Sequence, residues 1–147
     1  MATQPDKLPS QEKLLTDYVR RLEKLKDGRG LAHIHLSQLR PFNRRDQHIR
    51  TAAQNFDSLV KDMSGQLFTT KNADLFFFFK SAVKPQVETV IQKIRFLFGD
   101  DPLVDEEGKD GREFATWYDA TSQYEEIVQL VQTLAEAEEK RQSEVRN

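Results

Sequence analysis

The sequence predicts an α+β fold with one antiparallel sheet, and two observations indicate it. Short runs of β-prone residues alternate along the chain with longer runs in which apolar residues recur at steps of three and four. A length of 147 residues also suits one domain with its own hydrophobic core. We therefore expect one folded unit with a helix joined to it at each end.

The composition excludes several classes of protein. A formal net charge of −2, from 22 basic and 24 acidic residues, gives no general attraction to nucleic acids or membranes. The absence of cysteine excludes disulfides, a thiolate nucleophile and cysteine zinc sites. The N-terminus is too polar for a signal peptide, and the longest apolar run, Leu75 to Phe79, is far shorter than the roughly 20 residues of a membrane helix. We expect a cytoplasmic protein without a nucleic-acid partner, a membrane partner or a cofactor.

The first expected elements are a helix and a strand. Ser10 is a favourable N-cap residue, and apolar residues follow it at helical spacing until Gly28. The apolar positions are Leu14, Leu15, Tyr18, Val19, Leu22 and Leu25. Residues 31–36 then alternate as a strand does, with His33 and His35 on one face and apolar side chains on the other.

A long helix and a hairpin are expected next. Apolar residues recur at steps of three and four from Ile49 to Met63, within a helix expected at 43–63, and Gly65 ends the pattern. Residues 66–70 and 75–79 are both β-prone, and the segment between them, Lys71-Asn72-Ala73-Asp74, suits a turn. We expect a β-hairpin here.

The last third of the chain adds a helix, a strand and a final helix. The helix follows Pro85 and is broken by residues 99–102, and an acidic loop then leads to a strand at 114–118. The final segment, 121–147, is amphipathic up to Leu134 and strongly charged beyond it. We expect its last ten residues to be frayed or to form a linker.

Without the terminal helices, the order of elements is β-α-β-β-α-β. This is the ferredoxin-like arrangement, in which an antiparallel sheet carries two core helices on one face. Phe76 and Phe78 then point to one face of the sheet, and Phe77 and Phe79 to the other. Either the terminal helices or a partner must cover the second face, because bare aromatic surface marks an interaction site.

Two binding chemistries are open at this stage. Aromatic residues on a βαββαβ sheet can stack RNA bases, but the first strand offers histidines in place of aromatics and the net charge is negative. His33 and His35 could share a metal ion, but the sequence places no acid or third histidine near them at a recognisable ligand spacing. Buried phenylalanines and polar strand residues are the preferred interpretation, so no metal site is predicted.

The order of elements and two segments resemble the GGDEF domain of diguanylate cyclases. One segment runs from His35 to Asn43, and the other is the turn sequence Asn72-Ala73-Asp74-Leu75-Phe76, which aligns with the Gly-Gly-Asp-Glu-Phe signature. The resemblance covers residues 31–118. In the first segment Arg40 stands for the family's lysine and Asn43 for its base-contacting asparagine, while His35 and Ser37 occupy acidic positions.

The resemblance implies a degenerate domain. The family condenses two GTP molecules with a divalent metal that acidic residues hold, and hard cations require such oxygen ligands. Here Leu75 replaces the acidic residue of the signature, and Asn72 and Ala73 replace its glycines. We expect no enzymatic activity and no metal. Retained binding of GTP or a cyclic dinucleotide, through Arg40, Asn43 and Asp74, is the alternative, and RNA binding is a weaker one.

These inferences predict a catalytically inactive signalling module of a larger bacterial protein, which acts through protein contact. We divide it into a helical extension (1–30), the GGDEF-like domain (31–120) and a C-terminal helix or linker (121–147). The partner would be another protein domain or a second copy. The candidate contact residues are Tyr18, Leu22 and Leu25 on the first helix and Ile127, Val131 and Leu134 on the last.

Overall fold

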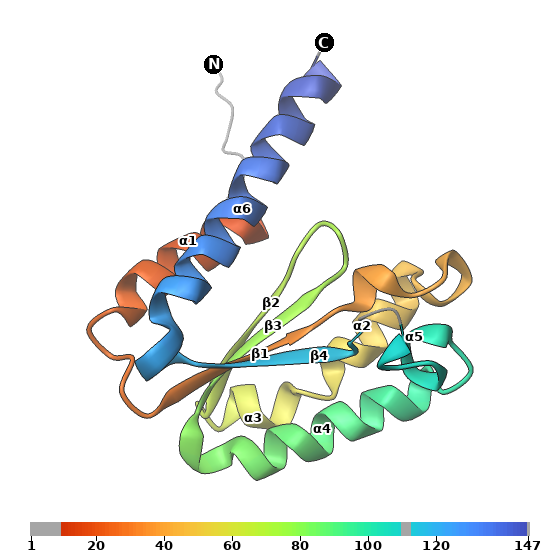
Figure 1. Ribbon diagram of the computed structural model, residues 1–147, viewed down its shortest axis with the longest axis horizontal. Coiled ribbons are helices and arrows are strands. Elements are labelled where there is room, and N and C mark those ends of the chain that lie inside the picture. Colours follow the sequence, from red (N-terminus) through yellow and green to blue (C-terminus); the bar gives the residue numbers. More distant parts are fainter. Residues whose placement is uncertain (1–9, 110–112, 147) are drawn as a thin grey trace.

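A computed structural model describes residues 10–109 and 113–146. This part of the chain is an α+β fold with a four-stranded antiparallel open sheet and six α-helices (Figure 1). The expected α+β class is therefore confirmed. The polar N-terminus at 1–9 and the end of the acidic loop at 110–112 lie outside the described residues.

The sheet has the order β2-β3-β1-β4, with every neighbouring pair antiparallel. Its strands are β1 (Arg29–Ile34), β2 (Gly65–Thr69), β3 (Leu75–Lys80) and β4 (Ala115–Asp119). Strand β1 begins two residues earlier than expected and ends at Ile34, because Leu36 already belongs to a 3₁₀ turn, Leu36–Gln38. Strands β1 and β3 occupy the centre, where both of their faces are covered.

Four helices cover one face of the sheet. They are α2 (Asp46–Gln54), α3 (Asp57–Lys61), α4 (Lys84–Leu97) and α5 (Pro102–Asp105). Phe77 and Phe79 of β3 point into this layer, and the ring of Phe56 stacks on Phe77 with 4.5 Å between ring centroids. These side chains form the larger of two hydrophobic cores.

The terminal helices α1 (Gln11–Leu22) and α6 (Ala120–Arg146) cover the opposite face (Figure 1). Phe76 and Phe78 point into this second core, where the Tyr18 ring lies 4.7 Å from the Phe78 ring. The hydroxyl of Tyr124 on α6 donates a hydrogen bond to the carbonyl of Val19 on α1 at 2.8 Å. The chain therefore buries all four phenylalanines with its own helices.

Three helix boundaries differ from the sequence expectation. The helix expected at 43–63 is divided into α2 and α3, because the Asn55 side chain donates to the carbonyls of Thr51 and Ala52 and closes α2. Helix α5 lies in the segment expected to be a loop, where Asp101 caps it. The last ten residues were expected to be frayed or to form a linker, and α6 remains helical through the described ones, to Arg146.

Over the described residues, every helix is too short or too polar to cross a bilayer.

Candidate functional site

The turn between β2 and β3 carries Asn72-Ala73-Asp74-Leu75-Phe76, the segment for which the sequence suggested a resemblance to the GGDEF signature. The side-chain oxygen of Asn72 accepts hydrogen bonds from the Thr70 hydroxyl and from the Asp74 N–H, and the Thr70 N–H donates to the Asp74 carbonyl at 3.0 Å. Ala73 has a φ of 78°, a left-handed conformation that favours glycine. Leu75 and Phe76 are fully buried. The segment is a closed turn that leads directly into the core.

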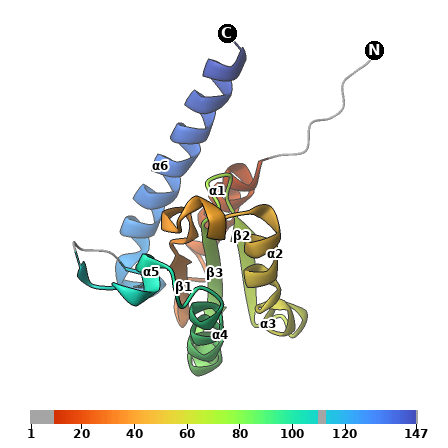
Figure 2. The same cartoon turned by 90° about the vertical axis from the view of Figure 1, so that its right-hand side faces the viewer.

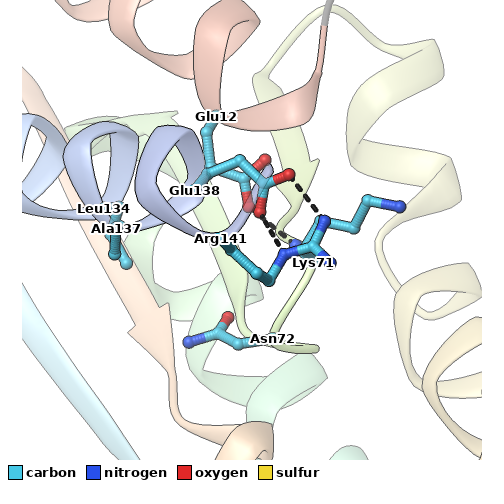
Figure 3. Close-up of a pocket in the computed structure, with 7 residues that line it drawn as sticks. All are labelled: Glu12, Lys71, Asn72, Leu134, Ala137, Glu138 and Arg141. Carbon is cyan, nitrogen blue, oxygen red and sulfur yellow. Dashed lines mark hydrogen bonds and ion pairs between the residues drawn. The ribbon is translucent and has the colours of Figure 1, made fainter. Parts of the chain in front are cut away.

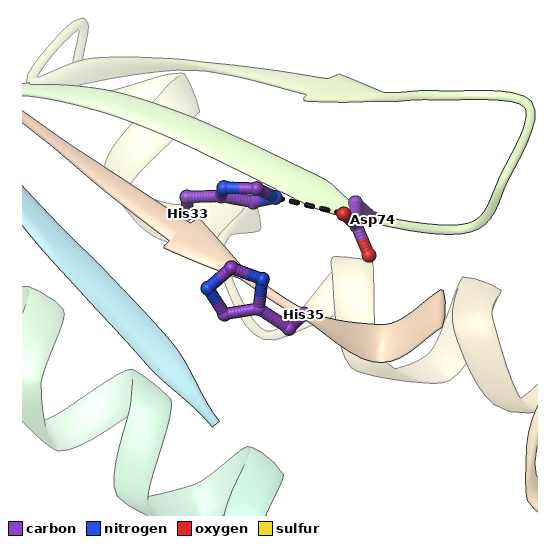
Figure 4. Close-up of side chains that lie close together, drawn as sticks. All are labelled: His33, His35 and Asp74. Carbon is purple, nitrogen blue, oxygen red and sulfur yellow. Dashed lines mark hydrogen bonds and ion pairs between the residues drawn. The ribbon is translucent and has the colours of Figure 1, made fainter. Parts of the chain in front are cut away.

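Asp74 is buried beneath this turn and is held by two donors. One carboxylate oxygen lies 2.8 Å from His33 Nε2, and the other accepts the Ser37 N–H at 2.8 Å (Figure 4). Burial alone would raise the pKa of Asp74, but the hydrogen bonds from His33 and Ser37 and the charge of His33 outweigh it and lower the pKa. The carboxylate is therefore ionised and tied to β1 and to the loop that follows it.

His35 lies beside this pair and belongs to a second hydrogen-bond chain. Its Nε2 is 2.7 Å from the Thr116 hydroxyl on β4, and that hydroxyl donates to the Glu113 carboxylate at 3.0 Å. Burial lowers the pKa of His35, and the neighbouring His33 lowers it further, against the weaker opposing influence of Asp74 and Glu113. The side chain is therefore a neutral imidazole at neutral pH.

His33, His35 and Asp74 together form a cluster with the chemistry of a metal site. One ligand atom from each lies within 4.8 Å of the other two. The two histidine rings are 4.1 Å apart, and the His33 ring stacks on Phe76 at the same centroid distance. The sequence indicated that the histidines share a face but missed their acid, because Asp74 lies 41 residues from His33. Only the pairing of β1 with β3 brings them together.

Arg40 and Asn43, two of the three predicted ligand-binding residues, gather around a different carboxylate. The Asn43 amide donates to Asp101 at 2.9 Å, and the Arg40 N–H donates to the same oxygen at 3.0 Å. The Arg40 guanidinium also donates to the Asp100 carbonyl at 2.9 Å. Burial would raise the pKa of Asp101, but these donors, the Leu103 N–H and the Arg40 charge lower it. The polar groups of Arg40 and Asn43 thus join two loops of this chain, whereas Asp74 bonds to β1.

The predicted partner-contact residues lie mostly within the second core. Leu22, Ile127 and Val131 are buried there, and Tyr18 and Leu134 pack against it. Leu25 is the exception, with 60% of its surface exposed. The apolar sides of α1 and α6 therefore cover the chain's own sheet, which is one of the two alternatives that the sequence left open. Of the six predicted residues, only Leu25 lies outside this packing.

A pocket of about 230 Å³ lies where α6 passes the tip of the β2–β3 hairpin (Figure 3). Glu12 of α1 accepts the Lys71 N–H of the hairpin at 2.8 Å, and Glu138 of α6 accepts two hydrogen bonds from Arg141, at 2.8 and 2.9 Å. Both carboxylates are buried, and the bonds from Arg141 lower the pKa of Glu138. This pocket joins the hairpin, α1 and α6.

We compared the chain with protein-family models, with curated proteins and with solved structures. None of the three comparisons gives a match. The functional inference therefore rests on the residues and contacts described above.

Proposed function

We propose that this chain is a catalytically inactive GGDEF-like domain that acts through protein contact. The environment of the signature-like turn is the observation that carries the proposal. Leu75 is fully buried in the larger core, and the Asp74 carboxylate is engaged by His33 and Ser37. The turn therefore presents none of the exposed acidic oxygens that would hold magnesium and a triphosphate.

Two features of the fold support the GGDEF-like assignment. The order of elements is compatible with the ferredoxin-like pattern, and the sheet, with strand order β2-β3-β1-β4, is antiparallel throughout. Ala73, which aligns with the second glycine of the signature, has a φ of 78°. A turn that retains a glycine-type conformation without the glycine fits descent from a glycine-containing turn.

Helix α6 is the element that we assign to protein contact. A kink at Gln123 divides it, and the part that follows, residues 124–146, corresponds to a length of about 35 Å. The first half packs on the sheet, while residues 139–144 are exposed, and this end extends beyond the body of the domain (Figures 1 and 2). A charged helix of this kind suits contact with another protein domain or with a second copy of the chain.

Nucleotide binding without turnover is the alternative, and the geometry favours it less. Arg40 and Asn43 both donate to Asp101, and Asp74 lies in a separate hydrogen-bonded group. Binding a nucleotide through all three residues would therefore require these internal bonds to be broken. Asp74 and Asp101 are buried, so each carboxylate would need a new hydrogen-bond partner once these bonds were broken. Such binding would therefore cost free energy.

The proposal can be tested by incubating the protein with GTP in the presence of Mg²⁺ or Mn²⁺. We expect no cyclic dinucleotide and no rise in melting temperature with GTP or a cyclic dinucleotide. Formation of product would contradict the inactive assignment. A melting-temperature rise without product would instead support the nucleotide-binding alternative.

The contact role of α6 can be tested by cysteine cross-linking, since the chain has no cysteine of its own. Ser143→Cys places a thiol on the exposed end of α6, and Gln92→Cys places one on the exposed side of α4 as a matched control. Selective dimer formation by Ser143→Cys would support self-contact through α6. A monomer in light scattering with no cross-linking at either position would exclude a second copy and assign the contact to a different protein domain.

A further inference from the structure

We propose that His33, His35 and Asp74 form a binding site for a divalent transition-metal ion, with zinc as the best-fitting ion. This inference is independent of the proposed protein contact. His33 lies on β1, His35 is the residue after β1, and Asp74 is the residue before β3. They gather on the face of the sheet that carries α1 and α6, beside Phe76. Figure 4 shows the three side chains close together.

The spacing of the three ligand atoms is close to that of a metal site. Zinc bonds of about 2.0–2.2 Å in a tetrahedral arrangement place neighbouring ligand atoms about 3.3 Å apart. His33 Nε2 and Asp74 Oδ2 are 2.8 Å apart, and all three ligand atoms lie within 4.8 Å of one another. Side-chain rotations that move the ligand atoms by about 1 Å would therefore allow all three to bind one ion, and the backbone of the strands would not need to change.

The donor types select among ions. Two imidazole nitrogens and one carboxylate oxygen suit zinc and neighbouring first-row ions, whereas magnesium and calcium prefer oxygen ligands throughout. An ion bound here would replace the hydrogen bond between His33 Nε2 and Asp74, and a neutral His33 would then carry its proton on Nδ1 instead of Nε2. His35 is only partly buried, so a fourth ligand position can be filled by water.

Hydrogen bonds outside the cluster hold two of the ligands in orientation. The Thr116 hydroxyl gives its single proton to Glu113, so it must accept the bond from His35 Nε2. This arrangement leaves Nδ1 of His35 with the lone pair that a metal needs. The second oxygen of Asp74 is fixed by the Ser37 N–H. A ligating histidine whose other nitrogen donates to a fixed acceptor is the usual outer-shell pattern of metal sites.

A buried aspartate–histidine pair can also stabilise a fold without any metal, and the experiment must separate the two roles. We would add Zn²⁺, Ni²⁺ or Mg²⁺ to the untagged, chelator-treated full chain and measure binding by calorimetry and thermal unfolding. We expect one Zn²⁺ per chain and a rise in melting temperature of about 5–10 °C at a hundredfold excess over the dissociation constant, with no effect of Mg²⁺. Absence of Zn²⁺ binding, or an equal response to Mg²⁺, would overturn the proposal.

Variants assign the ion to this cluster. His35→Gln removes the least buried ligand, and His48→Gln is the matched control because His48 is the only other histidine in the chain and lies on α2. We expect His35→Gln to abolish the Zn²⁺ response and His48→Gln to leave it unchanged. Unchanged binding in His35→Gln would overturn the assignment.

A third variant covers the case in which His35→Gln does not fold. Thr116→Val removes the hydroxyl that orients His35 and retains the shape of the strand residue. Loss of an outer-shell bond of this kind should weaken zinc binding by about 10–100-fold. Full affinity in a folded Thr116→Val protein would contradict the proposed geometry.

Discussion

The side-chain amide of Asn43 donates a hydrogen bond to the Asp101 carboxylate at 2.9 Å, although 58 residues separate the two along the chain. The same oxygen accepts the Arg40 N–H, and the other oxygen accepts the Leu103 N–H at the start of α5. All of these interactions require Asp101 to act only as an acceptor. The stability of two loops therefore depends on one buried carboxylate.

Asp101→Asn is expected to destabilise the fold by about 1–3 kcal/mol. The NH₂ group of the new asparagine cannot accept the hydrogen bonds that a carboxylate oxygen of Asp101 accepts now. At least one of the donors around it, from Arg40, Asn43 or Leu103, would lose its acceptor. Urea unfolding would measure the change as a lower midpoint. Asp100→Asn is the control, because Asp100 is exposed and its contact to Arg40 uses the backbone carbonyl. Equal effects of the two substitutions would contradict the assigned role of Asp101.

The same residue gives a pH dependence whose sign follows from its lowered pKa. A carboxyl whose pKa is lower in the folded state contributes stability above its ordinary pKa of 3.8, and this contribution is lost as the pH falls through the folded-state value. The stability difference between wild type and Asp101→Asn should therefore be constant above about pH 5 and shrink below about pH 4. Urea midpoints across this range would test it, and a difference that grows with acidity would exclude the mechanism.

Gly65→Ala at the start of β2 is expected to destabilise the protein by about 1–3 kcal/mol through overpacking. A Cβ atom at Gly65 would overlap the Phe77 ring and lie 2.5 Å from the Phe78 carbonyl oxygen. Gly99→Ala is the matched control, since its Cβ would meet its nearest atom, the Phe96 carbonyl oxygen, at 3.7 Å. Thermal unfolding should separate the two variants clearly, and a neutral Gly65→Ala would show that β2 pairs less closely with β3.

Ala73→Gly is expected to stabilise the hairpin turn by up to about 1 kcal/mol. The φ of 78° at Ala73 is strained for a residue with a Cβ atom, and glycine removes that strain. Gly28→Ala provides the reverse control, because Gly28 has a φ of 72° and no atom within 4 Å of an added Cβ. That substitution should destabilise by about 1 kcal/mol through backbone strain alone. Opposite signs in chemical denaturation are the expected result.

Glu138→Ala is expected to loosen the end of α6 without unfolding the domain. It removes the acceptor for Arg141 and for the Gln142 side chain, and with it the contact of this helix end with the pocket at the hairpin tip. Amide hydrogen exchange should become faster over residues 139–146 and stay unchanged in the sheet. Glu139→Ala, at an exposed neighbouring position, should leave the exchange pattern as it is.

The sequence was sufficient to predict the elements whose apolar pattern is regular. The hairpin, the strand at 114–118 and the amphipathic terminal helices all occur close to their expected positions. The division of the long helix could not be read from that pattern. It depends on the Asn55 side chain, which bonds to the helix backbone in place of the next turn.

The candidate site was less accessible to sequence reasoning for a different reason. His33 and Asp74 are close only because β1 pairs with β3, and Asn43 meets Asp101 only through the folding of two loops. Neither pair has a local spacing that could indicate it. The Asp101-Pro102 sequence was a usable signal for α5, since an aspartate N-cap followed by proline favours a helix start.

The hydrogen bond between Tyr124 and Val19 spans 105 residues, and this separation bears on the order of folding. The layer of α1 and α6 can close only after the two ends of the chain meet, whereas the pairings of β2 with β3 and of β1 with β3 join segments that are nearer in sequence. We expect a transient species in which the sheet is formed and the terminal helices are still detached. Such a species exposes Phe76 and Phe78 together, so refolding yield should fall as protein concentration rises.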